Sequence, residues 1–414
     1  MKMREANQEA CKRILEARPV WTDVRLARDV IPGMKKNLVL HTGPAIEWER
    51  MCRPQKAAIT AAMILEGLCD DIDEAEVLIK RGQVELDVNQ NHQAVGPMAG
   101  PISSSMAVAV VENRTYGNLA FAGPFNTGRK SPVYTGNITT QAIDIQRWLA
   151  EVWAPATSQA LHQLGGIDGR ALAGRALLMG DELHNRNLAA TSLFLNEITK
   201  GYLMASLPGD VLLEVMTFMQ ENIEMFWATP HLAVCKAMLD PAQGIENCSI
   251  VTNMASNGVE FGIVVSGLGN RYFSAPAPMV KGTYFPGFSD KEANPDLGGS
   301  RIKETAGFGG MCIASSPAMG LLLGERMKDI VAQTLQMYEI TTVENPAYQI
   351  PYLDFRGVPT GIDLIKVVET GITPIIDTAI NHREENHPFI GVGITIAPLE
   401  CFEKALQYLA NAKE

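Results

Sequence analysis

The chain has 414 residues, of which 46% are hydrophobic and 20% are charged, and its formal net charge is −11. This length and composition predict a folded protein with two or three domains and exclude a disordered chain. The acidic balance argues against a nucleic-acid surface, because phosphate binding requires clustered Lys and Arg, and here basic residues are scattered singly or in pairs.

The first 18 residues alternate charged and apolar positions at helical spacing, without the uninterrupted apolar run of a secretion signal. No stretch approaches the roughly 20 apolar residues required to span a bilayer. The seven cysteines show no CxxC spacing, and most stand in apolar runs, which is typical of reduced and buried thiols. We therefore expect a cytoplasmic protein that contacts no membrane and has no zinc site.

Residues 1–138 alternate strand and helix signals, which predicts an N-terminal α/β domain. The signals are a strand at 38–41, a helix opened by Pro54, a helix at 73–81 and a strand at 106–111.

Residues 139–245 are nearly all helical in pattern, which predicts a central helical bundle domain. We expect its first helix, from Thr140, to break near Pro155. Later helices flank Gly180 and cover 210–221 and 230–239.

Residues 246–414 return to α/β, and Asn257-Gly258 predicts a hairpin turn. The fold class is therefore α/β (α+β), with two mixed α/β domains around the bundle. Expected elements are strands at 248–254, 260–266, 272–273 and 390–396, and helices at 317–338 and 398–411.

The segment 179–187 places seven polar or hinge residues, interrupted only by Leu183, between two Ala/Leu-rich runs. Apolar flanks indicate that it lies against a core, where polar groups need partners. A helix beginning just after Asp181 would put Asp181, His184 and Asn185 on one face. An acid, an imidazole and an amide would then converge on one site.

A purely structural interpretation of the same segment stays open. Asp181 after Gly180 is a good helix N-cap. Glu182 and Arg186 are spaced for an ordinary exposed ion pair.

Three glycine-rich loops have backbone N–H groups and hydroxyls that are candidates for ligand binding. Loop 91–105 offers amides and hydroxyls for an anion or an oxyanion, although a tight connection between strands explains it equally well. Loop 253–271 contains Gly267-x-Gly269, but the following strand signal excludes a dinucleotide fingerprint. Loop 294–310 is dense in glycine and offers the Ser300 and Thr305 hydroxyls for a small anion, without a nucleotide P-loop. No serine stands in a nucleophile-elbow sequence, so a Ser-His-Asp triad is not predicted.

Short motifs in a fixed order run along essentially the whole chain, and together they resemble the AllG family, also called YlbE. The matching motifs are His41-Thr42-Gly43-Pro44 with Trp48, Ala94-Val95-Gly96-Pro97-Met98, Val111-Glu112-Asn113, Met179-Gly180-Asp181-Glu182 with His184, Arg186 and Asn187, Ser249-Ile250-Val251-Thr252, Val265-Ser266-Gly267-Leu268-Gly269, Asn294-Pro295-Asp296, Val368-Glu369-Thr370-Gly371-Ile372-Thr373-Pro374 and Ala397-Pro398-Leu399-Glu400-Cys401-Phe402.

The resemblance implies a role in allantoin (purine-nitrogen) catabolism as a subunit of oxamate carbamoyltransferase, with FdrA-like and AllH-like partner subunits. That assembly exchanges oxalurate and phosphate for oxamate and carbamoyl phosphate. One local departure is Asn91-His92, where the family pattern has two histidines. A paralogue acting on another carbamoyl or ureido substrate therefore stays open.

Phosphorolysis of a ureido carbonyl needs a phosphate site, an oxyanion site and a proton for the departing nitrogen. We hypothesise that His184 transfers the proton, that Asp181 sets its tautomer, and that Arg186 or Arg271 meets the substrate carboxylate. No cofactor or metal ligand is expected. The predicted substrate-binding and anion-binding residues are Gly96, Met98, Gly100, Ser104, Asn257, Arg271, Asn294, Asp296, Thr305, Gly309 and Gly310.

Two other classes of function stay open. The chain is a non-catalytic scaffold subunit if its motifs serve an interface with an FdrA-like partner. It is a metal-dependent hydrolase if Asp181 and His184 bind a metal ion. The sequence leaves a homo-oligomer open as well.

Overall fold

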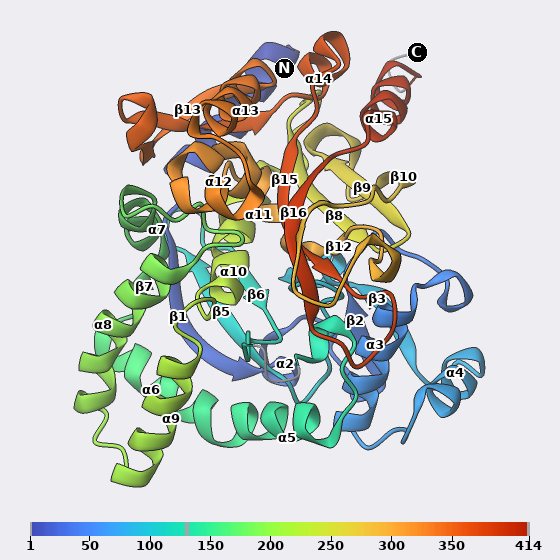
Figure 1. Cartoon of the computed structure of the whole chain (residues 1–414), viewed down its shortest axis with the longest axis vertical. Helices are drawn as coiled ribbons and strands as arrows, with labels where there is room; N and C mark the ends of the chain where they lie inside the picture. The colour runs from blue at the N-terminus through green and yellow to red at the C-terminus, as the bar shows by residue number, and fades with distance from the viewer. Residues whose placement is uncertain (1, 129–131, 412–414) are drawn as a thin grey trace.

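A five-stranded sheet joins the first third of the chain to its helical middle (Figure 1). The computed structural model describes residues 2–128 and 132–411. Helix α10 (Ala228–Leu239) packs on strands β5, β6 and β1, which explains why β5 is an almost continuous run of buried Ala and Val. The sheet has the order β4-β6-β5-β1-β7, with β1 Pro19–Leu26, β4 Ala94–Val95, β5 Ala107–Asn113, β6 Leu119–Ala122 and β7 Ile167–Asp168.

A smaller parallel pair, β2 (Leu38–His41) and β3 (Glu85–Val88), lies beside this sheet. Parallel strands need a crossover connection, and helices α3 (Arg53–Leu65) and α4 (Ile72–Lys80) provide it. Pro54 stands in the first turn of α3, as predicted. The chain leaves the carboxyl end of β2 at His41, and this loop reaches the candidate site described below. Two further helices of this region are α1 (Met3–Glu16) and α2 (Ala27–Val30).

The middle of the chain is helical, as predicted, but it does not break at Pro155. A π-helical turn, Leu149–Trp153, carries the chain from α5 into α6, so the missing proline N–H is absorbed without ending the helix. Every residue of α10 is buried. The other helices here are α5 Thr140–Trp148, α6 Ala154–Leu164, α7 Gly169–Leu178, α8 Leu188–Met204 and α9 Gly209–Glu221.

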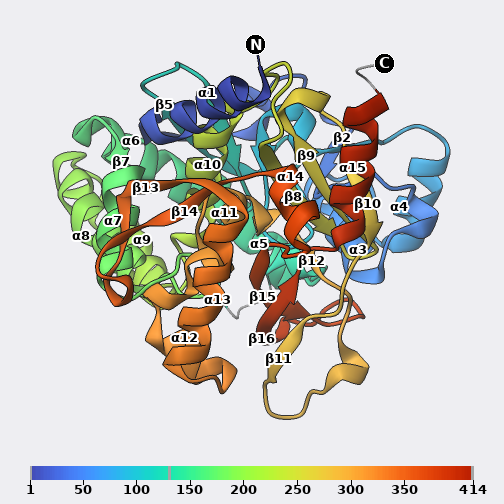
Figure 2. The same cartoon turned by 90° about the horizontal axis from the view of Figure 1, so that it is seen from above.

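The last part of the chain contains three groups of strands. In the view from above, helices α12 and α13 lie on the same side as β13 and β14, and β8, β9 and β10 lie toward the opposite side (Figure 2). One sheet has the order β10-β9-β8-β12, a second has the order β11-β16-β15, and β13 pairs with β14. The strands are β8 Val251–Asn257, β9 Glu260–Val265, β10 Phe273–Pro276, β11 Lys281–Tyr284, β12 Leu297–Gly298, β13 Thr341–Ile350, β14 Arg356–Ile362, β15 Ile375–Asn381 and β16 Phe389–Ile396; the helices are α11 Ile302–Thr305, α12 Pro317–Leu323, α13 Met327–Glu339, α14 Leu364–Thr370 and α15 Leu399–Asn411.

The mixed α/β class is confirmed, and so is the hairpin turn at Asn257-Gly258, where β8 and β9 pair in antiparallel orientation. The single helix predicted at 317–338 is wrong. Gly324 adopts a left-handed conformation (φ 71°) at the C-cap of α12, and the chain restarts as α13.

The largest hydrophobic core draws residues from all three sequence regions. Trp21 of β1 stacks on Phe194 of α8, with ring centroids 5.0 Å apart, and Phe226 stacks on Phe125 at 5.8 Å. Tyr348 of β13 belongs to the same core. The boundaries 1–138, 139–245 and 246–414 stay a prediction, because one core spans the regions that they separate.

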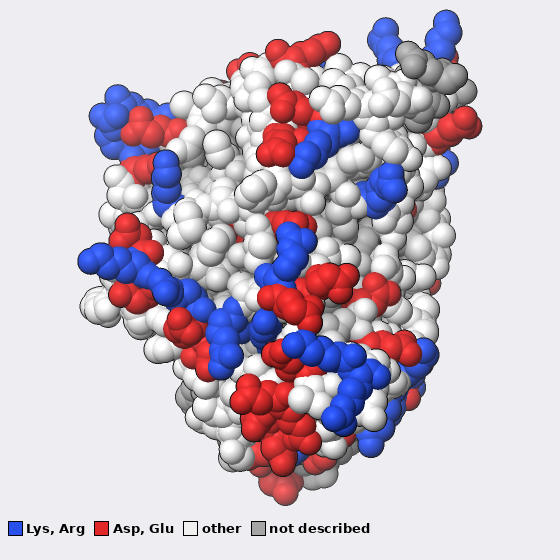
Figure 3. All heavy atoms as spheres, turned by 90° about the vertical axis from the view of Figure 1, so that its right-hand side faces the viewer, with Lys and Arg blue, Asp and Glu red and all other residues white. Residues whose placement is uncertain are grey.

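The face seen in Figure 3 carries acidic and basic side chains side by side, without a wide patch of one sign. Within residues 2–128 and 132–411, no helix has the length and apolar character needed to cross a bilayer. All seven cysteines are free thiols, and six are buried.

Candidate functional site

The segment between α7 and α8 is an irregular loop, so the helix predicted to begin after Asp181 is wrong. The buried carboxylate of Glu182 accepts hydrogen bonds from the backbone N–H groups of His184 and Arg186, each at 2.5 Å. The predicted exposed ion pair between Glu182 and Arg186 is therefore also wrong. Leu183 has a φ of 71°, which costs a leucine about 1–3 kcal/mol and persists only where surrounding contacts impose it.

Asp181 does not orient His184, contrary to the prediction. Its Oδ2 accepts a hydrogen bond from the backbone N–H of Ala190 at 2.8 Å, in the first turn of α8. Its Oδ1 lies 3.4 Å from Nε of Arg186, as an ion pair without hydrogen-bond geometry. Burial raises the pKa of Asp181 to about 6. Asp181 thus accepts a backbone hydrogen bond at the start of a helix, as the structural interpretation expected. The helix is α8, which begins at Leu188, and not one that begins directly after Asp181.

His184 is held at both ring nitrogens by residues more than 100 positions away in sequence. Its Nδ1 lies 2.6 Å from Oε1 of Glu304, and its Nε2 lies 3.0 Å from Oγ of Ser300. The pKa of His184 is lowered well below its usual value by burial and by the charges of Lys303 and Arg301, so the ring is neutral at neutral pH. The hydroxyl of Ser300, the imidazole of His184 and the carboxyl group of Glu304 are hydrogen-bonded one to the next. This arrangement activates nucleophiles in acyl transfer.

A buried guanidinium fixes the hydroxyl of this arrangement. Arg301 is fully buried and forms a bidentate ion pair with Asp296, while its Nη1 donates to Oγ of Ser300 at 2.7 Å. Its Nη2 also donates to Oγ1 of Thr378 on β15 at 2.7 Å. Asp296, predicted to bind an anion, instead neutralises Arg301.

Three further ionisable side chains near Glu304, those of Glu182, Lys303 and Asp377, are buried away from solvent. Burial raises the pKa of Glu304 to about 8 and that of Glu182 to about 7. Burial lowers the pKa of Lys303 to about 8, and burial together with the neighbouring carboxylates raises the pKa of Asp377. Carboxyl groups with such pKa values retain or release protons near neutral pH, which is the property required of acid–base groups.

Glu304 is expected to make stability depend on pH. Because its pKa is about 8 in the folded chain against an ordinary value of 4.5, the folded state binds more protons than the unfolded state between these values. The free energy of unfolding should therefore fall as pH rises from about 4.5 to about 8. Urea titrations at several pH values should show a shallower fall for Glu304→Gln than for the wild type. Parallel curves would contradict this assignment.

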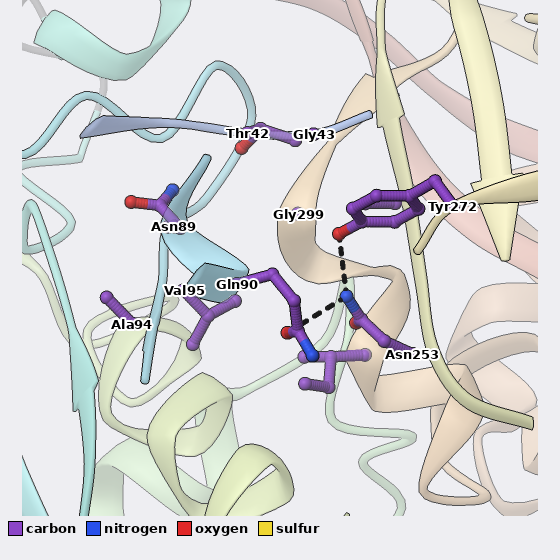
Figure 4. A pocket seen from close by; sticks show the side chains of 12 residues that line it. Thr42, Gly43, Asn89, Gln90, Ala94, Val95, Asn253, Tyr272 and Gly299 are labelled. Atoms are coloured by element: carbon purple, nitrogen blue, oxygen red, sulfur yellow. Dashed lines mark hydrogen bonds between the residues drawn. The ribbon is translucent and has the colours of Figure 1, made fainter. Parts of the chain in front are cut away.

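A narrow cavity lies at Gly299, the residue before Ser300 in the chain, between the N-terminal loops and β8 (Figure 4). Asn253 of β8 donates to Oη of Tyr272 at 2.7 Å and to Oε1 of Gln90 at 3.1 Å, and both bonds cross one side of the cavity. The cavity measures about 10 Å³, enough for one water molecule. Its lining residues are Thr42, Gly43, Asn89, Gln90, Ala94, Val95, Gly96, Asn253, Ala255, Tyr272, Gly299 and Ile302.

Close backbone approach at this cavity explains why residue 299 is glycine. A Cβ on Gly299 would lie 2.6 Å from the carbonyl oxygen of Gly96 and 3.0 Å from Oγ1 of Thr42. Gly299→Ala should therefore push the two loops apart and lower the free energy of unfolding by about 1–3 kcal/mol, as overpacking does. Thermal unfolding checks this, with Gly209→Ala as the control, because no atom of residues 2–128 and 132–411 lies within 4 Å of a Cβ there. An equal effect of both substitutions would contradict the crowding argument.

The predicted loop 91–105 divides into two parts. Gly96 lines the cavity, and the carbonyl of Met98 accepts hydrogen bonds from Oγ1 of Thr42 and the N–H of Gly299. A Cβ on Gly100 would meet Thr42 and Asn89, so this glycine shapes the same wall. Ser104, by contrast, donates to the carboxylate of Glu66 at 2.8 Å. Ser104, predicted to bind a ligand anion, therefore binds the carboxylate of Glu66 instead.

The remaining predicted residues make contacts within the fold. Asn257 donates to the carbonyl of Pro44, Asn294 donates to the carbonyl of Pro295, and Thr305 donates to the carbonyl of Arg301. Arg271 lies over the ring of Tyr408 at 4.8 Å, away from the His184 contacts. The amides of Gly309 and Gly310, predicted to hold an anion, donate to the carbonyl of Glu182 and to Oε1 of Glu304.

Over the parts of the chain that the structure describes, no group of three or more His, Cys, Asp or Glu side chains is arranged to hold a metal ion. Asp181 binds Ala190 and Arg186, whereas His184 binds Glu304 and Ser300. The metal-dependent hydrolase alternative required Asp181 and His184 to converge, and they bind different partners.

Sequence analysis missed Arg301 and Glu304 and named Ser300 only as a hydroxyl in a loop. The available signal was the segment 300–305, which carries Ser, Arg, Lys, Glu and Thr between glycine-rich loops. A lone acid, Asp377, inside the apolar strand β15 was a second signal. Charged residues in such settings must find partners, and here they partner each other around His184.

Fold and site together define a mixed α/β protein with a buried hydroxyl–imidazole–carboxyl relay, where the loop between α7 and α8 meets the segment 300–304. The family model described as oxamate carbamoyltransferase subunit AllG matches residues 84–300. The chain belongs to the AllG family.

Individual relatives match this chain over nearly its full length. Oxamate carbamoyltransferase subunit AllG of Escherichia coli K12 is 38% identical over 411 residues, which cover 99% of this chain and 98% of that protein. The uncharacterized protein YahG of the same organism is 40% identical over 405 residues, 98% of this chain and 85% of that protein. A crystal structure of a conserved protein of unknown function from Enterococcus faecalis V583 superposes with a TM-score of 0.96 at 38% identity, covering 99% of this chain and 98% of that chain.

Proposed function

We propose that this chain is a subunit of an oxamate carbamoyltransferase and that its His184 site takes part in the chemistry. The observation that carries the proposal is the relay from Glu304 through His184 to Ser300, beside the cavity at Gly299. The kinship to an oxamate carbamoyltransferase subunit at 38% identity supports the reaction. The reaction converts oxalurate and phosphate into oxamate and carbamoyl phosphate, in the breakdown of allantoin in the cytoplasm.

The chemistry assigns a role to the relay. Phosphorolysis breaks the bond between the carbamoyl carbon and the oxamate nitrogen, and this nitrogen must leave with a proton. A neutral imidazole accepts a proton and returns it at neutral pH, and a carboxyl group at Nδ1 holds its orientation. Glu304 therefore takes the orienting role that the sequence had suggested for Asp181. Arg186 lies in the same loop as His184, between α7 and α8, and its side chain is 35% exposed. We propose that it binds the substrate carboxylate.

The size of the cavity supports activity only in an assembly. Small-molecule sites measure roughly 300–1,000 Å³, whereas the cavity at Gly299 measures about 10 Å³. The loops around it must open, or a partner subunit must complete the site. We therefore propose FdrA-like and AllH-like partner subunits, with the substrate site at a subunit boundary.

Reconstitution with both partner subunits tests this function. The complex should convert oxalurate and phosphate into oxamate and carbamoyl phosphate, whereas this chain alone should not. Failure of the purified three-subunit complex to turn over oxalurate would reject the proposed reaction. Activity on a different ureido or carbamoyl substrate would instead identify a paralogue, in keeping with the similarity to uncharacterized YahG.

A scaffold role is the second candidate, because large apolar side chains are exposed on the helical region. Leu203 is 66% exposed at the end of α8, and Leu213 is 70% exposed on α9. Calorimetry of the isolated chain with phosphate and with oxamate separates the two roles. Binding without partners places a site on this chain. Binding only in a complex whose activity survives loss of the His184 imidazole would support the scaffold.

A further inference from the structure

We propose that Ser300 is a nucleophile that accepts the carbamoyl group covalently, so that transfer proceeds in two half-reactions through a carbamoyl ester on its Oγ. The inference rests on the proposed function and names a step within it. Oxalurate would donate the carbamoyl group to Ser300, and inorganic phosphate would then remove it.

The geometry around Ser300 is that of an activated hydroxyl. Its Oγ lies 3.0 Å from Nε2 of His184, whose Nδ1 lies 2.6 Å from Oε1 of Glu304. The pKa of Glu304 is about 8, so the carboxylate is ionised only as pH approaches and passes this value. In that form it accepts the proton on Nδ1, and the lone pair on Nε2 faces the Ser300 hydroxyl and accepts its hydrogen bond. The three groups are buried, so water does not compete for these contacts.

Arg301 adds a contact that a merely structural serine would not require. Its Nη1 donates to Oγ of Ser300 at 2.7 Å, so a fully buried cation faces the oxygen that would carry negative charge during attack. Asp296 and Thr378 hold the other donors of Arg301 and aim this one at Ser300. Glu304 is a positioning residue, because it acts through His184, whereas Arg301 contacts the reacting Oγ directly.

The two half-reactions conserve atoms and protons. Oγ of Ser300 attacks the carbamoyl carbon of oxalurate while its proton passes to Nε2 of His184. The bond from this carbon to nitrogen breaks, the nitrogen takes the proton from His184, and oxamate departs. An oxygen of inorganic phosphate then attacks the ester carbon. His184 takes the phosphate proton, the bond between the carbamoyl carbon and Oγ of Ser300 breaks, and His184 returns the proton to Oγ as carbamoyl phosphate leaves.

Space at the site favours two steps over direct transfer. Direct phosphorolysis requires oxalurate and phosphate, both anions, to be bound together. The cavity beside Gly299 measures about 10 Å³, so it must open or be completed by a partner subunit even for one ligand, and two ligands bound together would need still more room. A covalent intermediate lets the two anions use the same site in turn, without repulsion between them.

Isotope exchange in the three-subunit complex tests the intermediate. Oxalurate and isotopically labelled oxamate are incubated with the complex in the absence of phosphate. A carbamoyl-enzyme intermediate moves label into oxalurate, and the peptide that contains Ser300 gains the mass of one carbamoyl group after acid quench. Ser300→Ala should abolish exchange and lower turnover by roughly 10³-fold or more.

Ser316→Ala is the matched control, because this buried hydroxyl has no hydrogen-bond partner among the residues that the structure describes and lies outside the relay. It should retain exchange. If Ser300→Ala does not fold, the mass of the wild-type peptide still decides the matter. Full turnover without exchange and without a carbamoylated peptide would overturn the covalent step while leaving the transferase function intact. Label on a residue of a partner subunit would overturn it as well. A complex inactive on oxalurate would instead reject the underlying function.

Discussion

The His184→Gln variant is expected to lower turnover of oxalurate in the assembled complex by roughly 10²–10⁴-fold. Glutamine fills a similar volume and retains a hydrogen bond to Glu304 or Ser300, but it cannot exchange a proton at neutral pH. Because burial and the charges of Lys303 and Arg301 keep His184 neutral, the wild-type ring is ready to accept a proton. The measurement is steady-state kinetics of the complex with oxalurate and phosphate.

The control for this variant is His162→Gln on α6, whose side chain is 61% exposed. It should leave turnover unchanged. Gel filtration must show that both variants assemble with their partners to the same extent. Equal turnover of His184→Gln and wild type in an intact complex would remove His184 from the mechanism and favour the scaffold role.

Asp296→Asn is expected to lower the free energy of unfolding by about 3–5 kcal/mol, because it leaves the Arg301 guanidinium buried without a counter-charge. Both side chains are inaccessible to solvent, and the bidentate contact supplies the only carboxylate bonded to Arg301 among the described residues. Urea unfolding of the isolated chain, followed by circular dichroism, measures the change. Activity should fall with it, since Arg301 also positions Ser300.

The exposed pair of Arg326 and Asp329 provides the control, and Asp329→Asn should not change stability measurably, because solvent screens such pairs. A double variant, Asp296→Leu with Arg301→Met, should lose less stability than Asp296→Asn alone. Removing both charges leaves no isolated ion in the core. An unchanged urea midpoint for Asp296→Asn would show that Arg301 is hydrated or otherwise neutralised.

Local patterns predicted many of the elements because their causes are local. The strand β2 and the turn at Asn257-Gly258 follow from β-branched or apolar runs and from the backbone freedom of glycine. Pro155 and Gly324 misled the prediction for opposite reasons. A π-helical turn accommodated the proline, and a left-handed glycine ended α12 inside a segment predicted to be one helix.

Local sequence patterns predicted His184 but not the residues that bind it. His184 was found because polar residues between apolar helices must be satisfied. Its partners were not found, because Glu304 is 120 residues away in sequence and no helix or strand spacing connects them. Asp181 was close in sequence and plausible as a partner, yet the left-handed turn at Leu183 separates it from the ring.

The order of residues alone determined the mixed α/β class, the family and the importance of the segment around His184, since these depend on composition, periodicity and short motifs. Tertiary structure decided which carboxyl group meets the imidazole, that Ser300 stands on its other side, and that Arg301 is neutralised by Asp296. The physical reason is desolvation. Once these charged groups are enclosed in a dry core, each must be paired with whichever complementary group the packing brings nearest, however distant it is along the chain.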